Sequence, residues 1–227
     1  MNVEILQRGA FSSALVHLEP GEEFTSESGA MYRASANVGI DVTTRSFGKG
    51  GVLGGLKRVL AKESFFLSTY RVHDANPGEV ALAPVHVGSV RQIDVAPDTP
   101  WICTGGSYLG SGPGLRIETE FQGLKGLFTG ESISFVRVSG SGPLLVSAFG
   151  RIVEHDVEGE LVVDTGHVVA FTEGLDYSIS KVGGSWIQSW LAGEGIVLRF
   201  SGLGKLLVQS HNPSEFGGLL GPQLPER

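Results

Sequence analysis

Three glutamates are the residues of this chain whose type and spacing could do chemistry together. Glu63, Glu131 and Glu194 each follow a short segment rich in glycine and leucine or tryptophan, at intervals of 68 and 63 residues. Carboxylates that converged on one axis could hold a hard cation, because such ions prefer several carboxylate oxygens. The alternative is that each glutamate caps a turn by accepting backbone N–H hydrogen bonds. The sequence favours capping, because that role needs no second group.

A second landmark recurs with the glutamates. Each glutamate is followed by an apolar strand and then by another strand that is preceded or opened by a glycine, and these glycines are Gly78, Gly142 and Gly204. Self-similarity at a fixed period is the signature of an internal repeat. We therefore expect an internally triplicated chain, in which one pattern of strands occurs three times.

The repeat predicts three units, at about residues 10–85, 86–149 and 150–212, followed by a short tail at 213–227. Each unit is too short and too rich in strands to bury its apolar face alone. We expect the three units to pack around a pseudo-threefold axis as one domain that spans residues 1–227. Whether such a subunit stays monomeric or joins a larger ring is left open.

The segments before the three glutamates are apolar and contain glycine. Exposed together, they would form a patch for self-association, for another protein or for peripheral contact with a membrane. Buried, they would fill the space between strands, and the sequence does not decide between the two. The candidate patch residues are Leu53, Leu56, Leu124, Leu127, Phe128, Trp186 and Trp190.

Composition and local pattern predict an all-β fold with little helix. Of the 227 residues, 41% are hydrophobic and 18% charged, and the 34 glycines are about double the ordinary usage. Apolar residues alternate with polar ones or glycine at 38–42 and 115–119, which is typical of half-exposed antiparallel strands. The only helix-like windows are the three glycine-leucine segments and 214–220, after Asn212 and Pro213, and each is at most about two turns long.

Turn signals separate the expected strands. The clearest are Glu19-Pro20-Gly21-Glu22, Ala96-Pro97-Asp98-Thr99 and Asp164-Thr165-Gly166, which we interpret as the same turn in the three units. His167 follows the third turn, and we expect it to contact the Asp164 carboxylate locally. The glycine-rich stretch 105–114 has no Lys-Ser or Lys-Thr ending, so we interpret it as a hairpin loop and not as a phosphate-binding loop.

The charge and the single cysteine limit the possible partners and compartments. A net charge of −7 repels phosphate backbones and disfavours nucleic acid. Cys103 alone cannot form an intramolecular disulfide, and we expect it to be a small buried apolar residue. The start of the chain has no basic stretch followed by an apolar one, and no run approaches 18 apolar residues. We therefore expect a cytoplasmic protein that does not span a membrane.

No motif in the sequence points to catalysis, a metal or a cofactor. Gly-x-Ser-x-Gly does not occur, and the six histidines form neither a His-x-His pair nor a helical pair. Cys103 has no basic neighbour in sequence that would lower its pKa. We expect no catalytic residues, no bound metal and no cofactor.

Several stretches together resemble a known family over nearly the whole chain. The chain is similar to uncharacterised bacterial proteins that are grouped with the fungal "altered inheritance of mitochondria" protein. The stretches that carry the resemblance are Leu18-Glu19-Pro20-Gly21-Glu22, Glu27-Ser28-Gly29-Ala30-Met31, Gly54-Gly55-Leu56-Lys57-Arg58, Phe121-Gln122-Gly123-Leu124, residues 163–171 and residues 193–200.

The resemblance implies a triplicated β architecture like that of the tryptophan RNA-binding attenuation protein, called TRAP-like. It implies no activity and no catalytic residues, because the family has no established biochemical function. The mitochondrial member is associated with inner-membrane organisation, which suggests a structural role. RNA binding does not transfer, because shared architecture does not transfer function and no stripe of basic residues repeats in this acidic chain.

The sequence therefore predicts a non-enzymatic β protein that acts in scaffolding or self-assembly, or that binds a protein or a membrane surface. The alternative is a module that binds a small ligand or a cation, either at the pseudo-threefold axis or in the clefts between the repeats. Nucleic-acid binding is the weakest of these hypotheses, since it would need a basic groove with exposed aromatic residues.

Overall fold

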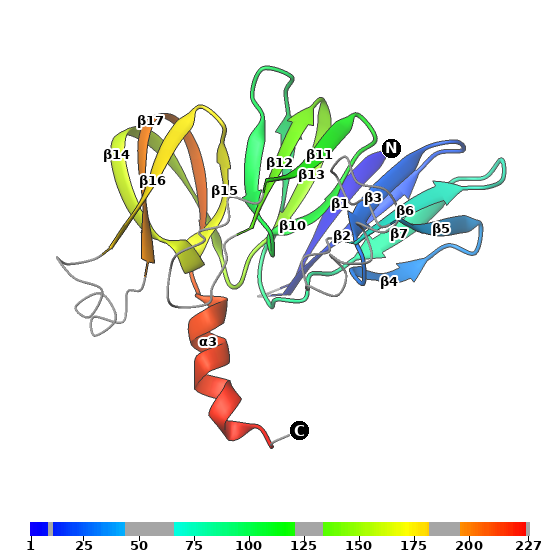
Figure 1. Cartoon of the computed structure of the whole chain (residues 1–227). Helices are drawn as coiled ribbons and strands as arrows, with labels where there is room; N and C mark the ends of the chain where they lie inside the picture. Colours follow the sequence, from blue (N-terminus) through cyan, green and yellow to red (C-terminus); the bar gives the residue numbers. More distant parts are fainter. Residues whose placement is uncertain (9–10, 44–65, 121–133, 182–195, 226–227) are drawn as a thin grey trace, which may run out of the picture.

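The computed structural model describes residues 1–8, 11–43, 66–120, 134–181 and 196–225. The described chain is built almost entirely of antiparallel strands, with one short α-helix near its C-terminus (Figure 1). The strands are β1 (Asn2–Arg8), β2 (Phe11–Leu18), β3 (Glu23–Glu27), β4 (Met31–Ala34), β5 (Val38–Thr43), β6 (Leu67–Val72), β7 (Gly78–Leu82), β8 (Val90–Val95), β9 (Trp101–Thr104), β10 (Tyr108–Ser111), β11 (Leu115–Glu120), β12 (Phe135–Gly140), β13 (Gly142–Ser147), β14 (Ile152–Asp164), β15 (Val168–Thr172), β16 (Leu175–Lys181) and β17 (Ile196–Gln209).

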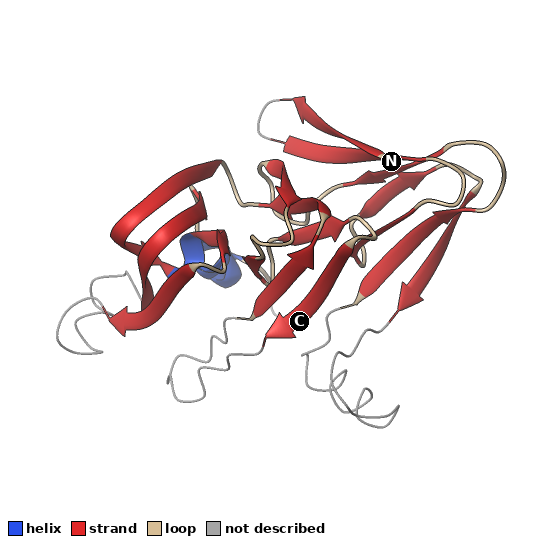
Figure 2. Cartoon of the chain, turned by 90° about the horizontal axis from the view of Figure 1, so that it is seen from above, coloured by secondary structure: helices blue, strands red, loops and turns tan. Residues whose placement is uncertain are grey.

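The strands form three sheets, in the orders β1-β2-β7-β4, β5-β6-β3-β10-β13-β8 and β11-β12-β9-β15-β17-β14, with β16 also paired to β17. Strands β1 to β7 lie at one end of the molecule, and β14 to β17 curl into a half-barrel at the other (Figure 1). Seen from above and coloured by secondary structure, the molecule consists almost entirely of strands, and helix is confined to one small region in blue (Figure 2). The expectation of an all-β fold with little helix is confirmed.

Alternation of side chains explains how single strands are placed. In β2, Ala14, Val16 and Leu18 are fully buried, while the residues between them are half-buried. This is the period-two pattern of a strand with one face on a core. Every residue of β15 is buried, because Val169 and Ala170 pack in one core cluster while Val168 and Phe171 pack in another.

Three hairpins stand at the positions of the glycine-leucine segments. Strand β5 pairs with β6, β11 with β12, and β16 with the first half of β17, all antiparallel. The chain between the two strands of each hairpin contains one of the three segments, and those residues lie outside the described ranges. The alternating patterns at 38–42 and 115–119 are therefore confirmed as strands β5 and β11.

Three other strands share an irregularity. The register shifts by one residue where β4 pairs with β7, where β10 pairs with β13, and where β15 pairs with β17. The extra residue is Tyr32, Leu109 and Val169 respectively. A β-bulge places two residues opposite one and increases the local twist of the strand. The same device therefore occurs once in each third of the chain.

Sheets cross from one third of the chain to the next at two junctions. Strand β3 pairs with β10, with Ser26 opposite Gly110. Strand β9 pairs with β15, with Cys103 opposite Ala170. Cys103 is fully buried in a core cluster that spans the second junction, so the expectation of a buried, apolar cysteine is confirmed.

Two expectations from the sequence are wrong in detail. The stretch 105–114 is not only a loop, because Tyr108–Ser111 form the buried strand β10. Tyr108 and Ser111 hydrogen-bond to each other inside the protein, at 2.8 Å between Oη and Oγ. Glycine in this strand permits a close approach of the neighbouring strand β3, a role that the sequence pattern did not distinguish from a turn.

The three turns are also not equivalent. The turns at Glu19–Glu22 and Ala96–Thr99 close with backbone hydrogen bonds of 3.0 Å and lead from β2 to β3 and from β8 to β9. The turn at Asp164 leads instead from β14 to β15. In the last third of the chain β14 continues without a turn through Gly159, whose φ of 105° is readily adopted only by glycine.

The expected C-terminal helix is confirmed as α3 (Pro213–Leu220). Asn212 caps it, since its side-chain oxygen accepts hydrogen bonds from the backbone N–H groups of Ser214 and Glu215. The helix projects away from the sheets (Figure 1), and Phe216 holds its start against Phe149 at a ring-centroid distance of 5.1 Å. Among the described residues, no helix has the length and apolar character needed to cross a membrane.

Candidate functional site

The site residues predicted from the sequence cannot be placed. Neither the three candidate axial carboxylates nor any residue of the candidate apolar patch belongs to the described ranges, so the cation site and the patch both stay predictions. The residues concerned are Glu63, Glu131, Glu194, Leu53, Leu56, Leu124, Leu127, Phe128, Trp186 and Trp190. Within the described part of the chain, no three His, Cys, Asp or Glu side chains come close enough together to hold a metal ion.

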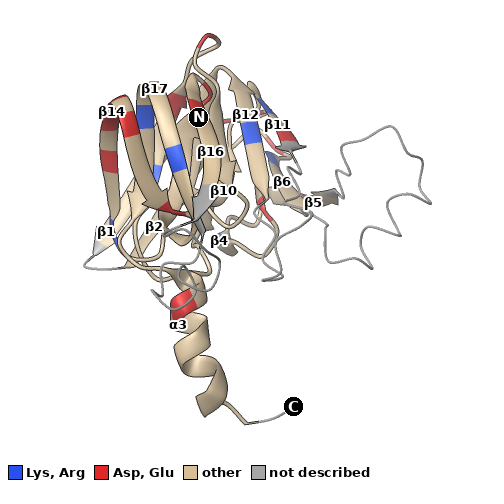
Figure 3. Cartoon of the chain, turned by 60° about the vertical axis from the view of Figure 1, so that its left-hand side comes forward, with Lys and Arg blue, Asp and Glu red and all other residues tan. Residues whose placement is uncertain are grey.

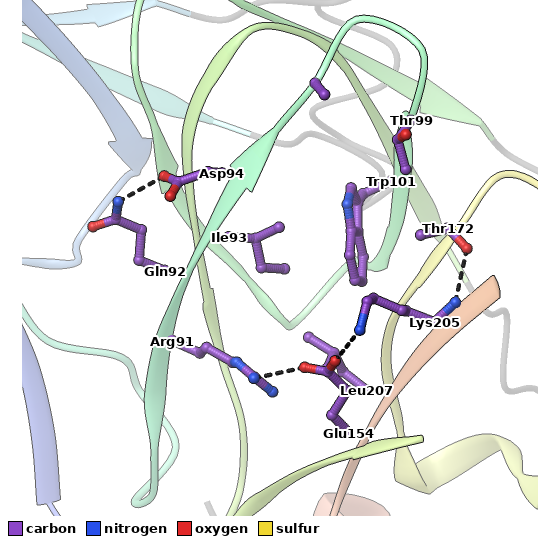
Figure 4. A pocket seen from close by; sticks show the side chains of 11 residues that line it. Arg91, Gln92, Ile93, Asp94, Thr99, Trp101, Glu154, Thr172, Lys205 and Leu207 are labelled. Atoms are coloured by element: carbon purple, nitrogen blue, oxygen red, sulfur yellow. Dashed lines mark hydrogen bonds and ion pairs between the residues drawn. The ribbon is translucent and has the colours of Figure 1, made fainter. Parts of the chain in front are cut away.

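A cleft of about 330 Å³ lies where the middle of the chain meets its last third. Strands β8 and β9 form one side, and β14, β15 and β17 form the other (Figure 4). Trp101, Ile93 and Leu207 supply its apolar surface. Its polar lining comes from Arg91, Gln92, Asp94, Thr99, Glu154, Thr172 and Lys205.

An ion-pair network crosses this cleft. Arg91 on β8 reaches Glu154 on β14 at 2.6 Å, and Lys205 on β17 pairs with the same carboxylate (Figure 4). Lys205 also contacts Asp156 at 3.0 Å. The hydrogen bond from Lys205 and the nearby Arg91 charge lower the pKa of Glu154, although partial burial opposes them. Glu154 therefore stays ionised at neutral pH. It connects β8 with β17, two strands that do not pair with each other.

The cleft combines polar side chains with an apolar wall. Asp94 accepts a hydrogen bond of 2.8 Å from the Gln92 side chain, and Trp101 and Ile93 face each other across the apolar part (Figure 4). The described lining contains no serine, cysteine or histidine. Paired charges beside an apolar wall are suited to holding a ligand that is partly apolar and partly charged.

A second candidate surface consists of two open strand edges. Strand β4 pairs with β7 on one side only, and residues 160–163 in the second half of β14 pair with β17 on one side only, within the described part of the chain. Both edges carry exposed apolar side chains, namely Tyr32 and Val162. An unpaired edge presents free N–H and C=O groups and is a ready template for another strand.

Opposite charges pair between neighbouring strands of the seven-stranded sheet. Arg199 on β17 donates to Glu160 on β14 at 3.0 Å, and Arg137 on β12 donates to Glu118 on β11 at 3.1 Å. Figure 3 shows the resulting bands of acidic residues on β14 and β11 beside basic residues on β17 and β12. Acidic and basic groups thus alternate across the strands.

His167 does not make the predicted contact with Asp164. The Asp164 carboxylate accepts a hydrogen bond from the backbone N–H of Gly166 at 2.8 Å, which caps the turn. Instead, the Nδ1 atom of His167 lies 2.7 Å from the carbonyl oxygen of Gln209 on β17. The histidine therefore joins the turn to the neighbouring strand, so a structural role is confirmed with a different partner.

Neither candidate surface was predictable from a local pattern in the sequence. Arg91, Glu154 and Lys205 come from three distant parts of the chain, so no local motif could have grouped them. The open edges also had no signal in the sequence. Tyr32, Leu109 and Val169 are all apolar or aromatic strand residues at the bulge positions, and only the strand pairing distinguishes the first from the other two.

The fold and these surfaces define a class of protein: an all-β molecule of joined antiparallel sheets, with one cleft and two open strand edges described above. The family model described as mitochondrial biogenesis AIM24 matches residues 3–211. The chain therefore belongs to the AIM24 family, as the resemblance in sequence indicated.

Two relatives from Streptococcus pyogenes support this assignment. An uncharacterised protein of serotype M6 is 32% identical over 218 residues, which cover 92% of this chain and 86% of the relative. A crystal structure of a protein from the same species superposes with a TM-score of 0.81 at 28% identity and covers 98% of this chain and 99% of its own. Neither description states an activity.

Proposed function

We propose that this protein is a non-enzymatic assembly scaffold. Copies of the chain join head to tail, because the open edge of β4 in one copy pairs with the open edge of β14 in the next. The observation that carries this proposal is that strands in corresponding positions already pair in this way at two junctions inside the chain.

In this proposal the chain is a threefold repeat with TRAP-like architecture, in which each strand of a unit has a counterpart in the other two units. Strands β4, β10 and β15 correspond, because each carries a bulge and pairs with the strand that ends its unit. Strands β3, β9 and the second half of β14 correspond in the same way, because each pairs with the returning strand of a hairpin. On this alignment, β3 pairs with β10 and β9 pairs with β15, and the remaining pair of corresponding strands, the second half of β14 and β4, is left without this contact.

The register of the contact between copies follows from the two internal junctions. Gly110 lies opposite Ser26 at the first junction, and Ala170 lies opposite Cys103 at the second. Arg33 occupies the corresponding position in β4, and Val163 the corresponding position in β14. Arg33 of one copy therefore faces Val163 of the next, and Ala34 faces Val162.

Side-chain exposure supports a missing neighbour at both edges. Tyr32 is 55% exposed, whereas its counterparts Leu109 and Val169 are 1% and 0% exposed. Val162 is 46% exposed, whereas its counterpart Ile102 is 7% exposed and its other counterpart, Thr25, is half-buried. Covering apolar surface of this kind stabilises an association by roughly 25 cal/mol per Å².

The outer edges of the three hairpins do not show the same contrast. Strands β5, β11 and β16 each pair with one neighbour in all three parts of the described chain. Their outer edges are thus unpaired wherever they occur, so nothing in the internal junctions predicts a partner for them. The contact between β4 and β14 joins two different surfaces and is heterologous, so it closes a ring or continues as a filament.

Light scattering across a dilution series tests the proposal. The wild-type chain of 24.0 kDa should form oligomers, and Val162→Lys should dissociate them, because a lysine would be buried unpaired at the new strand contact. Val153→Lys is the matched control, because Val153 lies on the first half of the same strand and is 38% exposed. A wild-type protein that is monomeric at every concentration would overturn the proposal.

Mixing two variants distinguishes a head-to-tail contact from a symmetric one. Val162→Lys leaves the β4 edge intact, and Tyr32→Asp leaves the β14 edge intact. Each variant alone should be monomeric, while an equimolar mixture should stop at a dimer, because only one productive contact can form. A mixture that stays monomeric would contradict pairing between β4 and β14.

A further inference from the structure

The cleft described above occupies the same place in the repeat as the N-terminal strand β1. Ala14 on β2 lies opposite Leu82, and Arg91 on β8 lies opposite Val146. Leu82 and Val146 each pair with the residue just before the bulge of the next strand, so Ala14 and Arg91 are counterparts in the repeat. Strand β1 pairs with the outer edge of β2 along its whole length. The outer edge of β8 has no paired strand among the described residues.

The residues that surround β1 have counterparts that line the cleft. The Met1 ammonium group donates to Glu22 at 2.6 Å, and the Met1 methyl group lies 3.1 Å from where a Cβ on Gly112 would be. Val3 and Ile5 pack on the cluster that contains Leu145. The counterparts of Glu22, Gly112 and Leu145 in the next unit are Thr99, Thr172 and Leu207, and all three line the cleft.

We infer that the cleft receives an extended segment of a partner protein, which adds to the outer edge of β8 as β1 adds to β2. Strand addition supplies main-chain hydrogen bonds, and alternate side chains enter the cleft. Val16, which lies opposite Val3 of β1, is fully buried, whereas its counterpart Ile93 is only partly buried. The guest strand would cover Ile93 and the face of Trp101.

The register of β1 gives the preference of the site. Val3 lies opposite Val16, and Ile5 lies opposite Ala14. A guest residue in the place of Val3 would meet Ile93 and should be apolar. The residue two positions later would meet Arg91, which now reaches across the cleft to Glu154.

An acidic residue is favoured at that second position. A guest carboxylate would take the place of Glu154 as the partner of Arg91, and Glu154 would keep its pairing with Lys205. A guest lysine would place a like charge beside Arg91 and is disfavoured. The recognised segment is therefore extended and carries an apolar residue followed two positions later by Asp or Glu.

The test uses three fluorescently labelled peptides with the sequence of residues 1–8: the native sequence, Ile5→Glu and Ile5→Lys. Fluorescence anisotropy on the Val162→Lys protein keeps strand addition separate from self-assembly. We expect saturable binding of the Ile5→Glu peptide, about tenfold tighter than that of the Ile5→Lys peptide. The inference does not depend on the proposed assembly, so either can fail alone.

Protein variants make the test specific. Arg91→Ala gives β8 the residue that β2 has at Ala14, so the preference should change from the Ile5→Glu peptide to the native peptide. Ile93→Lys should abolish binding of both, with thermal unfolding as the check that each variant is folded. Absence of saturable binding to the parent protein, or an unchanged preference in Arg91→Ala, would overturn the inference.

Discussion

Cys103 shows what burial does to a single residue in this protein. It is fully buried, and burial raises the pKa of its thiol to about 12. The thiolate is the reactive form of cysteine, so a thiol of this kind is inert at neutral pH. Cys103 sits at the junction of β9 with β15, where a small apolar residue allows the two strands to pack closely. Its role is therefore in packing.

Glu173 carries a prediction about pH. Arg137 donates to both of its carboxylate oxygens, at 2.6 and 2.8 Å, and this lowers the pKa of Glu173. A lowered carboxyl pKa contributes stability above the unfolded pKa, and this stability is lost as the pH falls through the folded pKa. Glu173→Gln should reduce the free energy of unfolding at pH 7 by about 1 kcal/mol after solvent screening.

Urea unfolding as a function of pH measures this effect. The difference between Glu173→Gln and wild type should shrink as the pH falls below 4.5, the ordinary pKa of the carboxyl. Glu158→Gln is the control, because no ion pair of Glu158 occurs among the described residues. A difference that stays constant down to acidic pH would show that the ion pair does not contribute.

Strand β10 carries a prediction at the scale of an element. A Cβ atom on Gly110 would lie 2.5 Å from a ring carbon of Phe24 and 2.9 Å from the carbonyl oxygen of Thr25. Both neighbours belong to β3, across the first internal junction. Gly110→Ala should therefore destabilise the protein by about 1–3 kcal/mol, because neither the buried ring nor the paired backbone can move away easily.

Chemical denaturation of the Gly110→Ala and Gly106→Ala variants measures this destabilisation against a control. Gly106 lies four residues earlier, and a Cβ there would meet nothing within 4 Å. Gly106→Ala should leave the denaturation midpoint close to that of wild type. Equal midpoints for the two variants would mean that the β3 and β10 strands are not packed as closely as the structure shows.

Elements also show how far a local pattern reaches. The strands β5 and β11 and the helix α3 were predictable, because alternation and a cap are features of neighbouring residues. Strand β10 was not, because two of its four residues are glycine and serine and its burial comes from β3 and β13 on either side. Tertiary contacts overrode the turn propensity of that stretch.

The whole molecule carries the prediction that follows from assembly. Partners that bind only the folded chain raise its stability with concentration, by about 2.7 kcal/mol at a hundred times the dissociation constant. The thermal midpoint of the wild type should therefore rise with protein concentration in scanning calorimetry. Val162→Lys should show no such rise, and Val153→Lys should behave as the wild type does. A midpoint independent of concentration in all three proteins would speak against assembly.

At the scale of the whole molecule, the sequence by itself determined the fold class, the family and the buried character of Cys103. Each of these depends on composition or on residues close together in the chain. Only the tertiary structure decided that β9 lies beside β15, that β4 and β14 have open edges, and that Arg91, Glu154 and Lys205 meet in one cleft. Alternation marks a strand and its buried face, but the choice of neighbour is made by residues far away in sequence.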